Sequence, residues 1–524
     1  MSDQVRLSSL STFPRLLMHH AQARPNHPAT REKDMGIWQT WTWSQVAEEV
    51  RAMASGLAEL GFKRGDNLAI IGDNRPRLYW AMYAAQCLGG VPVPMYQDAV
   101  AAEMIFVLQD AGIKFAIVED QEQVDKLLEN KAQCPALQHI LYDDPRGLRH
   151  YNQPFLHGLD EVQEMGRIHN RNHPEFLDAE IELGKSDDIA VMLYTSGTTG
   201  KPKGALLTHA NLIAGARAVA GWHGLGPADR VLSSLPIYHI NGQVIATTNT
   251  FVSGGSLIAP KKFHVSEWWK MAEKFEATWI NMVPTIIAYL LNAAEPGKTY
   301  RFPKVRFGRS ASAPLPPEHH VAFEQVFGIS VIECMGMTET SSVAFANPQD
   351  PAKRKIGSLG KPCGIEARVV DGELQLRGPN VMRGYYKSPE QTQSSFTPDG
   401  WLLTGDLGRE DEDGYFYITG RKKELIIKGG ENIAPREIDE ALLKHPAVLE
   451  AAAVGVPDRE YGQEILACIV VKPGFELGRD EVDAHCLREL GRYKAPRHVR
   501  FVEALPKGPS GKVQRMALAR EFDG

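Results

Sequence analysis

Cysteine is scarce in this 524-residue chain. The six cysteines are Cys87, Cys134, Cys334, Cys363, Cys468 and Cys486. No two of them form a CxxC pair, which argues against a zinc site and against a disulfide framework and fits a reducing compartment. We therefore expect the cysteines to be small core or loop residues.

Long apolar runs and blocks of like charge are also missing. The longest apolar runs, such as Ile465 to Val471, are far shorter than a membrane span, and the segment MSDQVRLSSLSTFPRLL at the N-terminus lacks a signal-peptide core. The 58 basic and 64 acidic residues are dispersed along the chain, unlike those of a nucleic-acid-binding face. We predict a soluble, cytoplasmic protein that binds no nucleic acid and has no membrane span.

The chain does have the composition of a large globular protein. Hydrophobic residues make up 43% and charged residues 23%, which is close to the average for soluble domains. A chain of this length exceeds what one hydrophobic core organises, so about two to four domain-sized units are expected.

Helical segments and short apolar segments alternate in the first half of the chain. Residues 42–60 carry apolar side chains at helical spacing, and Thr42 and Gln45 suit a capping box. An apolar run follows at Leu68 to Ile71, and the alternation returns from Ile189 to about Ile332. This pattern predicts an α/β fold with a large, doubly wound N-terminal domain.

The pattern changes beyond Lys361 to short strands and tight turns, such as those at Asp371-Gly372 and Asp413-Gly414. Another unit of helices and strands fills the last hundred residues. We predict a large domain over residues 1–420, which includes a β-rich subdomain at about 361–420. A small, mobile α+β domain is predicted over residues 421–524.

The strongest functional pattern is Tyr194-Thr-Ser-Gly-Thr-Thr-Gly-Lys-Pro-Lys-Gly204, which follows an apolar strand and precedes a helix. Its glycines let backbone N–H groups converge on an anion, and its hydroxyls and lysines add donors and positive charge. The segment is therefore predicted to bind phosphate. It is not a Walker loop, because Pro202 stands where the second glycine of GxxxxGK would fall.

This loop is similar to the phosphate-binding loop of the adenylate-forming superfamily, which includes acyl-CoA synthetases, coumarate-CoA ligases, firefly luciferases and nonribosomal peptide adenylation domains. The resemblance covers nearly the whole chain, and further motifs follow in the family's order. It implies that the loop closes over the β- and γ-phosphates of ATP, with Thr195 among the catalytic residues. The matching positions are Thr195, Ser196, Gly197, Thr198, Thr199 and Lys203.

Two further segments resemble the family's acyl and adenine contacts. Leu235-Pro-Ile-Tyr-His-Ile-Asn-Gly242 resembles the segment in which a histidine lies between the phosphates and the acyl pocket, which implies that His239 is a gate or a phosphate ligand. Ser310-Ala-Ser-Ala-Pro-Leu315 is similar to the stretch whose backbone flanks adenine, and the matching positions include Ser312 and Ala313.

The segment Glu333-Cys-Met-Gly-Met-Thr-Glu-Thr340 resembles the family's metal-binding segment. The resemblance implies that Glu339 holds Mg²⁺ and that Thr338 contacts the α-phosphate. Other nucleotide-binding candidates in the segment are Glu333, Cys334 and Met335. Many relatives have an aromatic ring at the position of Met335, so a weaker hold on adenine is an open alternative.

Two motifs after residue 399 resemble the family's ribose site and domain junction. Gly400-Trp-Leu-Leu-Thr-Gly-Asp406 matches the ribose site, where the carboxylate of Asp406 suits two adjacent hydroxyls. The stretch from Gly420 to Gly430 resembles the domain junction, with Arg421 as a ribose or phosphate contact and Lys423 as the hinge.

By the same resemblance Gly429 and Gly430 border the pantetheine tunnel and thus bind CoA. Pro506-Lys-Gly-Pro-Ser-Gly-Lys512 is similar to the C-terminal loop in which a lysine reaches the acyl carboxylate and the α-phosphate. This makes Lys512 a catalytic and nucleotide-binding candidate.

Together these motifs imply a ligase that uses ATP and Mg²⁺ to convert a carboxylic acid to an acyl-adenylate and then transfers the acyl group to CoA, with AMP and diphosphate as products. In the family the small domain rotates between the two half-reactions. A stand-alone enzyme that loads a carrier protein, a catalytically silent nucleotide-binding scaffold and an oxidative luciferase are the alternatives. A homodimer is left open.

The identity of the acid is not fixed by these motifs. Arg306-Phe-Gly-Arg309 precedes the adenine stretch and by family position runs beside the acyl pocket, so Arg306 and Arg309 are pocket candidates. A buried guanidinium is costly unless it is paired, so an Arg309 that faces the pocket predicts a short acid with a second anionic or polar group. The alternatives are that Arg309 points outward or pairs with a neighbouring acid.

Overall fold

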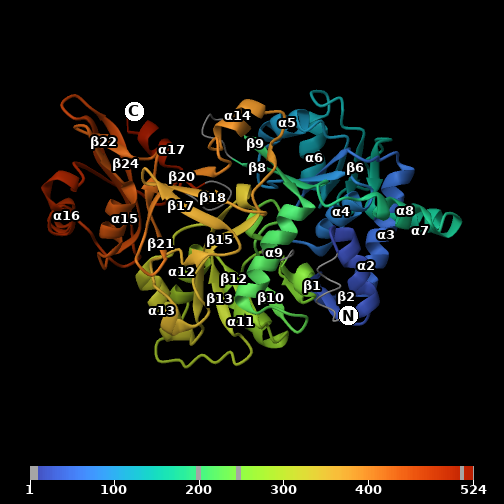
Figure 1. Ribbon diagram of the computed structural model, residues 1–524, viewed down its shortest axis with the longest axis horizontal. Coiled ribbons are helices and arrows are strands. Elements are labelled where there is room, and N and C mark those ends of the chain that lie inside the picture. Colours follow the sequence, from blue (N-terminus) through green and yellow to red (C-terminus); the bar gives the residue numbers. More distant parts are fainter. Residues whose placement is uncertain (1–9, 196–201, 243–248, 508–512, 523–524) are drawn as a thin grey trace. The chain divides into compact units, whose positions relative to one another are not determined.

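The computed structural model describes residues 10–195, 202–242, 249–507 and 513–522 (Figure 1). They fall into two compact units. The first comprises Met1–Arg354, Pro362–Glu366 and Arg377–Phe396, and the second comprises Lys355–Lys361, Ala367–Leu376 and Thr397–Gly524. The predicted α/β class, with a large N-terminal part, a β-rich segment and a smaller C-terminal part, is confirmed.

The predicted domain boundary near residue 420 falls inside the second unit, and the predicted β-rich subdomain contributes residues to both units. Compactness does not report which parts of a chain move together. The domains at 1–420 and 421–524 therefore stay predictions.

The first unit begins with alternating helices and strands. In chain order these elements are α2 (Phe13–Ala23), β1 (Pro28–Asp34), β2 (Ile37–Thr42), α3 (Trp43–Glu59), β3 (Asn67–Ile71), α4 (Pro76–Cys87), β4 (Val91–Met95), α5 (Ala101–Asp110), β5 (Phe115–Val118), α6 (Gln121–Asn130), β6 (His139–Tyr142), β7 (Leu156–Gly158), α7 (Leu159–Asn172) and α8 (Phe176–Leu183). The predicted capping box of α3 is present, because the Gln45 N–H donates to Thr42 Oγ1 and the Thr42 N–H donates to Gln45 Oε1.

The remaining elements of the first unit contain the predicted phosphate, adenine and metal segments. They are β8 (Ile189–Thr195), β9 (Lys203–Thr208), α9 (His209–His223), β10 (Arg230–Leu232), α10 (Asn249–Ser253), β11 (Ser256–Ala259), α11 (Val265–Lys274), β12 (Trp279–Met282), α12 (Pro284–Asn292), β13 (Phe307–Ser310), α13 (Pro317–Phe327), β14 (Val331–Met337), the 3₁₀ helix η2 (Thr338–Thr340), β15 (Ser342–Ala346), η3 (Pro351–Lys353), β16 (Lys361–Pro362), β19 (Gly384–Tyr385) and α14 (Pro389–Ser394).

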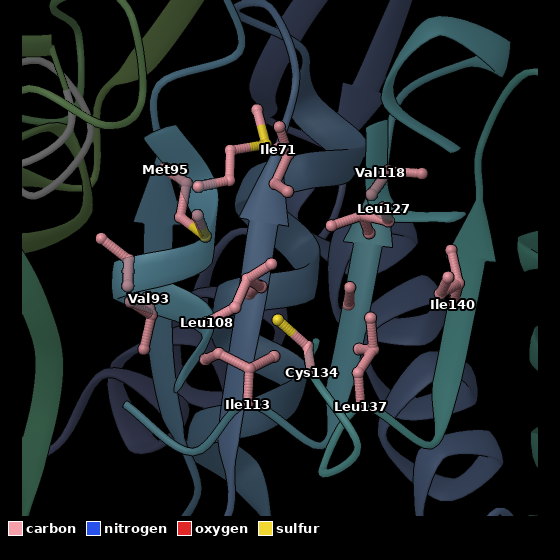
Figure 2. Close-up of a cluster of buried hydrophobic side chains, with 14 of the residues drawn as sticks. Ile71, Val93, Met95, Leu108, Ile113, Val118, Leu127, Cys134, Leu137 and Ile140 are labelled. Atoms are coloured by element: carbon pink, nitrogen blue, oxygen red, sulfur yellow. The ribbon is translucent and has the colours of Figure 1, made fainter. Parts of the chain in front are cut away.

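A parallel sheet in the order β4–β3–β5–β6–β7 forms one core of this unit. Its strands β3 and β5 are buried along their whole length, as expected for a sheet that is covered on both faces. Figure 2 shows Ile71, Val93 and Val118 of the strands in one cluster with Leu108 of α5 and Leu127 of α6. The apolar runs read from the sequence therefore became the strands of this sheet.

A larger sheet runs in the order β16–β15–β14–β13–β12–β10–β11–β1–β2. The strands from β14 to β1 are parallel neighbours, whereas β2 and β15 pair antiparallel to the strands beside them. Ligands of such sheets bind beyond the carboxyl ends of the parallel strands. The predicted adenine stretch follows β13 and the predicted metal segment ends β14, so both lie at this edge.

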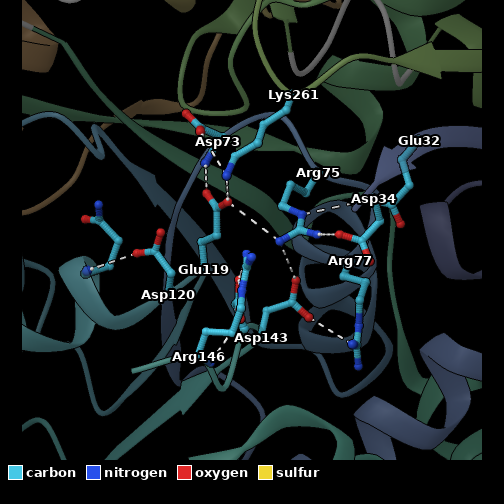
Figure 3. Close-up of polar contacts among 12 residues, drawn as sticks. Glu32, Asp34, Asp73, Arg75, Arg77, Glu119, Asp120, Asp143, Arg146 and Lys261 are labelled. Carbon is cyan, nitrogen blue, oxygen red and sulfur yellow. Dashed lines mark hydrogen bonds and ion pairs between the residues drawn. The ribbon is translucent and has the colours of Figure 1, made fainter. Parts of the chain in front are cut away.

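A network of charged side chains lies at the carboxyl ends of strands from both sheets (Figure 3). Arg75 forms ion pairs with Asp34 at 3.0 Å, Asp143 at 3.5 Å and Glu119 at 3.6 Å. Lys261, which follows β11, adds an ion pair with Glu119 at 2.5 Å. Arg75 therefore joins β1 of the larger sheet to the strand ends of the smaller one.

The second unit contains two sheets. Its elements are β17 (Glu366–Val370), β18 (Glu373–Arg377), β20 (Leu402–Glu410), β21 (Phe416–Arg421), β22 (Ile426–Lys428), β23 (Glu431–Ile433), α15 (Pro435–Leu443), β24 (Val448–Asp458), β25 (Gly462–Val471), α16 (Arg479–Lys494), β26 (His498–Phe501) and α17 (Arg515–Arg520). The strand orders are β17–β18–β20–β21 and β23–β22–β25–β24, with β26 beside β25. Ile438, Leu442 and Val482 of α15 and α16 pack on the second sheet.

All six cysteines are buried thiols. Within the described ranges, no helix combines the length and the apolar character that a membrane span requires.

Candidate active site

The two ends of the predicted phosphate loop lie on a hairpin. β8 and β9 pair antiparallel, with Thr195 opposite Lys203 and Tyr194 opposite Gly204. Ser196, Gly197, Thr198 and Thr199 lie outside the described residues. At Gly204 an added Cβ would come within 2.9 Å of the Met192 sulfur and 3.1 Å of the Tyr194 ring, so a larger residue here would require the Met192 side chain to shift.

The base of the hairpin is attached to α5 through Tyr194. The Tyr194 hydroxyl donates to Asp110 Oδ2 at 2.5 Å, and burial together with this carboxylate raises the pKa of Tyr194. The hydroxyl therefore stays protonated and keeps its donor at neutral pH. This contact fixes the strand that leads into the phosphate loop.

A tyrosine that sequence reasoning missed lies between the phosphate loop and the predicted metal residue. The Tyr385 hydroxyl donates to Glu339 Oε1 at 2.8 Å. The Lys203 ammonium lies 5.1 Å from the centre of the Tyr385 ring, within the range of a cation–π contact. Lys203 and Glu339, which are 136 positions apart in the chain, are thus brought together by one side chain.

Glu339 has the features of a ligand for Mg²⁺. It lies in the 3₁₀ turn η2 and is half-buried, and no lysine or arginine of the described ranges pairs with it. No group of three or more acidic, histidine or cysteine side chains that suits a metal occurs in these ranges. Mg²⁺ in nucleotide sites needs only one or two carboxylates, since phosphate oxygens and water supply the other ligands. The residues present therefore fit a Mg²⁺ that arrives with a nucleotide.

His239 is connected to the predicted adenine stretch through Asn241. The Asn241 N–H donates to His239 Nδ1 at 3.1 Å, and Asn241 Nδ2 donates to Ser312 Oγ at 3.0 Å. Ser312 has a φ of 78°, which a non-glycine residue adopts only when its surroundings hold it there. Asn241 was not predicted, although it lies inside the segment that contains His239. The structure brings His239 and Ser312 to one place.

The other end of the adenine stretch is held by Glu333. This residue is 4% exposed, and its Oε1 accepts a hydrogen bond from the Leu315 N–H at 3.1 Å. Burial raises the pKa of the neighbouring Cys334 to about 12, so its thiol is neutral. Glu333 of β14 thus holds the end of the adenine stretch at Leu315. Ala313, Met335 and Thr338 are half-buried at the same edge of the sheet.

The two arginines of the predicted acyl segment lie in different environments. Arg306 precedes β13, at the amino end of the strand, and forms an ion pair with Asp229 at 2.7 Å. The adenine stretch lies beyond the carboxyl end of the same strand. The structure does not bring Arg306 to the other candidates.

Arg309 is 1% exposed and lies within β13. Its Nε and Nη2 donate to Asn281 Oδ1 at 3.3 and 2.9 Å, and the guanidinium carbon is 4.8 Å from the centre of a Trp279 ring. Asn281 in turn donates to Ser233 Oγ at 3.2 Å.

No carboxylate of the described residues lies within ion-pair distance of Arg309. Burial lowers the pKa of Arg309 to about 10, which leaves the guanidinium protonated at neutral pH. A positive charge is therefore buried here against a neutral amide and an aromatic ring.

In the second unit, Asp406 and Arg421 are paired across two strands. They are direct neighbours in the β20–β21 ladder, and Arg421 Nε lies 2.7 Å from Asp406 Oδ1. Asp406 is 2% exposed. Lys423 follows in an exposed turn. The structure brings Asp406 and Arg421 together, and their roles at a ribose stay predictions.

Gly429 and Gly430 form the turn between β22 and β23, with φ values of 56° and 88°. A Cβ on Gly429 would approach Tyr461 and the hydroxyl of Tyr493 at 3.2 and 3.4 Å. A cavity of about 370 Å³ adjoins the hairpin, and its lining includes Asn432 and Tyr493. Lys512 lies outside the described residues.

Comparison with known proteins relates this arrangement to one family. The profile of the AMP-binding enzyme family matches residues 17–386, and that of the AMP-binding enzyme C-terminal domain matches residues 437–512. The sulfoacetate–CoA ligase of Cupriavidus necator is 58% identical over 347 residues, which are 63% of this chain and 67% of that protein. An oxalate–CoA ligase of Arabidopsis thaliana is 32% identical over 90% of this chain and 91% of its own length.

Among solved structures, the o-succinylbenzoate coenzyme A synthetase MenE of Bacillus subtilis in complex with ATP and a magnesium ion superposes with a TM-score of 0.79. It is 29% identical and covers 96% of this chain and 98% of its own.

Proposed function

The chain belongs to the AMP-binding enzyme family and is an AMP-forming acid–CoA ligase, and we propose that its acid is short and carries a second anionic group. The reaction uses ATP, Mg²⁺ and CoA, as in the relatives that match nearly the whole chain. A short sulfonated acid is the first candidate for the substrate, and a short dicarboxylic acid is the second.

The observation that carries the proposal is the guanidinium of Arg309, which is buried without a carboxylate partner among the described residues. Taking a charge out of water costs several kcal/mol even after the protein relaxes. The amide oxygen of Asn281 offers only a neutral acceptor. A sulfonate or a second carboxylate would supply the missing charge, and its oxygens suit the fork of a guanidinium.

The named substrates of two relatives support the same chemical class. Sulfoacetate has a sulfonate and a carboxylate on one methylene carbon, and oxalate has two carboxylates bonded directly to each other. The sulfoacetate–CoA ligase is 58% identical to this chain, and the oxalate–CoA ligase is 32% identical. The higher identity is the reason that we favour a sulfonated acid over a dicarboxylic acid.

In the first half-reaction, the carboxylate of the acid attacks the α-phosphorus of ATP, and diphosphate leaves. Both reactants are anionic, so the protein's main task is to position them and to screen their charges. Lys203 and the loop from Thr195 to Thr199 would bind the β- and γ-phosphates, and Thr338 the α-phosphate. Glu339 would hold Mg²⁺, which would supply positive charge to screen the phosphates.

The adenine would lie on the stretch of Ser312 and Ala313, with Glu333, Cys334 and Met335 at its edge. His239 would separate the phosphates from the acid, in an orientation fixed by Asn241. Lys512 would neutralise the acid carboxylate as it attacks.

The remaining roles fall to the second unit. The carboxylate of Asp406 would accept hydrogen bonds from the ribose hydroxyls, with Arg421 holding it in place at 2.7 Å. In the second half-reaction the CoA thiol attacks the acyl carbonyl and AMP leaves. Gly429 and Gly430 would border the pantetheine arm, and a rotation at Lys423 would exchange Lys512 for this glycine turn.

The test measures AMP release with free CoA over a panel of acids. The panel compares acids of similar size with and without a second anionic group. Sulfoacetate and malonate should exceed propionate and butyrate in kcat/KM by about 10²-fold or more, because a site that binds a polar group rejects analogues without it. A preference for acids of eight or more carbons would refute the proposal.

The same assay separates the two alternatives. AMP release that gives no thioester with free CoA would indicate a carrier protein as the acceptor. No diphosphate release with any acid would indicate a silent scaffold.

A further inference from the structure

We infer that Tyr385 is a positioning residue of the adenylation site, which holds Glu339 in the orientation that binds Mg²⁺ and ties it to the strand that leaves the phosphate loop. The inference rests on the proposed role of Glu339 as the metal ligand. None of the motifs that identify the site includes Tyr385.

The contact between Tyr385 and Glu339 is directed at one carboxylate oxygen. The hydroxyl donates to Oε1 at 2.8 Å, and no lysine or arginine of the described ranges pairs with the carboxylate. A hydrogen bond to one oxygen restrains the position of the carboxylate and leaves the other oxygen available to a cation. Hydrogen bonds to a residue that binds a metal orient that residue and contribute to the affinity for the metal.

The backbone of Tyr385 is held from two sides. β19 pairs antiparallel with β9, with Tyr385 opposite Ala205 and Gly384 opposite Leu206. From the other side, the Tyr385 N–H donates to Oγ1 of Thr392, within α14, at 2.8 Å. The backbone that carries the ring is therefore held on both sides, and the hydroxyl reaches the carboxylate of Glu339 from this fixed strand.

The turn of Glu339 is fastened to the same segment by its own backbone. The Met382 N–H donates to the Glu339 carbonyl at 2.7 Å, three residues before Tyr385. The Arg383 N–H donates to the Leu206 carbonyl of β9 at 3.0 Å. The segment 382–386 thus contacts both the metal turn and the phosphate-loop strand, so the two cannot shift independently.

The ring of Tyr385 adds a second link, because the ammonium of Lys203 lies 5.1 Å from its centre. Lys203 and Glu339 carry opposite charges and lie on opposite parts of one tyrosine, its ring face and its hydroxyl. The phosphates and the metal of a bound nucleotide need a cation and an anion at a fixed separation. Tyr385 provides that fixed separation before the nucleotide binds.

The experiment measures metal binding without turnover. Mn²⁺ stands in for Mg²⁺, and its affinity is read by electron paramagnetic resonance with saturating ATP and no acid. Tyr385→Phe removes the hydroxyl and keeps the ring, so the contact with Lys203 survives. It should weaken Mn²⁺ binding by about 10-fold, the scale of one hydrogen bond to a charged group, and leave metal-free ATP binding unchanged.

Tyr386→Phe is the matched control, because it removes a hydroxyl one residue away while its N–H still donates to the Gly204 carbonyl. The Mn²⁺ affinity of this variant should equal that of the wild type. A double-mutant cycle then tests whether Tyr385 acts through Glu339. In a Glu339→Gln background, Tyr385→Phe should have no further effect on Mn²⁺ affinity.

The outcomes separate failure of this inference from failure of the proposed site. Equal Mn²⁺ affinity in the wild type and Glu339→Gln would overturn the role of Glu339. A loss in Glu339→Gln, together with an unchanged or tighter affinity in Tyr385→Phe, would overturn the positioning role alone. Equal and additive losses in both backgrounds would mean that Tyr385 acts on the fold rather than on the carboxylate, which also overturns it.

Discussion

Replacing Arg309 by methionine should change the choice of acid more than it changes stability. The substitution keeps a long side chain but removes the charge and its donors. In the wild type this charge is 1% exposed and contacts Asn281 and Trp279, with no carboxylate partner among the described residues. If the charge serves the acid, its removal should affect doubly anionic acids only.

The expected effect on stability is small because opposing contributions nearly cancel. The amide oxygen of Asn281 loses its donors, which costs about 1–3 kcal/mol, and the loss of the contact with Trp279 costs up to about 2 kcal/mol. Against this, the variant no longer buries a charge, and the penalty for a buried ion is several kcal/mol. We expect the free energy of unfolding to change by no more than about 2 kcal/mol in either direction.

The expected effect on the acid is large. Losing a buried charge pair to a ligand costs about 2–5 kcal/mol, so kcat/KM for sulfoacetate should fall by about 10²-fold or more. For propionate, which lacks the second anion, kcat/KM should stay the same or rise.

The assay is AMP release with both acids, alongside chemical unfolding. Arg306→Met is the matched control, since Arg306 lies at the amino end of the same strand in an exposed ion pair with Asp229. This variant should keep the wild-type ratio of kcat/KM for sulfoacetate to kcat/KM for propionate. If Arg309→Met also kept that ratio, the argument from the charge of Arg309 would be wrong. It would also be wrong if kcat/KM fell equally for both acids while the protein was strongly destabilised, because Arg309 would then be structural.

Three further predictions concern the network, acid stability and the hinge. Arg75→Met should destabilise the first unit by about 1–3 kcal/mol, because Glu119 and Asp143 are 4% and 3% exposed and would each lose one of two counterions, while Lys261 and Arg77 remain. Thermal unfolding should show little change for the exposed control Arg146→Met, and an equally mild Arg75→Met would contradict the prediction. Burial by itself would raise the pKa of Glu324, but the nearby His320 and hydrogen bonds from the Val331 N–H and Arg354 lower this pKa to about 2. The stabilisation that Glu324 contributes is therefore complete above its ordinary pKa of 4.5 and is lost as the pH falls toward 2. Urea unfolding should therefore show the advantage of wild type over Glu324→Gln shrinking below pH 4.5, and a constant difference would refute this. Lys423→Pro should fold but keep only one half-reaction, because proline fixes φ at a residue that, as the predicted hinge, visits two backbone conformations. Diphosphate exchange and acyl transfer to CoA are measured separately. If both activities stay intact, the hinge lies elsewhere.

Local patterns were enough to predict much of the fold. The capping box at Thr42 and Gln45 and the run at Leu68 to Ile71 depend on residues that are close in sequence, and both are present in the structure. Helix caps and apolar periodicity describe the fit of a segment to its own secondary structure. The α/β class follows from these local signals and does not require knowledge of distant contacts.

The supports of the site were not predictable in the same way. Tyr385 and Glu339 are 46 residues apart, and a Gly-Tyr pair after a loop carries no periodic pattern. Asn241 and Ser312 are 71 residues apart. Such contacts depend on sheet order and register, which single-sequence patterns do not encode.

The difference between Arg306 and Arg309 shows the limit of position alone. They are three residues apart, and both were pocket candidates. The strand β13 has only four residues, from Phe307 to Ser310, so three positions along the chain lead from one edge of the sheet nearly to the other. Arg306 therefore contacts Asp229 at one edge, while Arg309 lies in the interior near the other.

The sequence allowed two explanations of Arg309 that involve no ligand, and the structure weakens both. An outward side chain would be exposed, but only 1% of Arg309 is accessible. A neighbouring acid would lie within ion-pair distance, but none of the described residues provides one. The remaining partner, Asn281, is neutral, and two hydrogen bonds to one amide oxygen with a contact to Trp279 roughly offset the several kcal/mol that burial of the charge costs but leave its full positive charge without a counterion among the described residues. On the proposed function, an anionic acid would supply the charged partner that the described residues do not provide, so the guanidinium of Arg309 would select the acid.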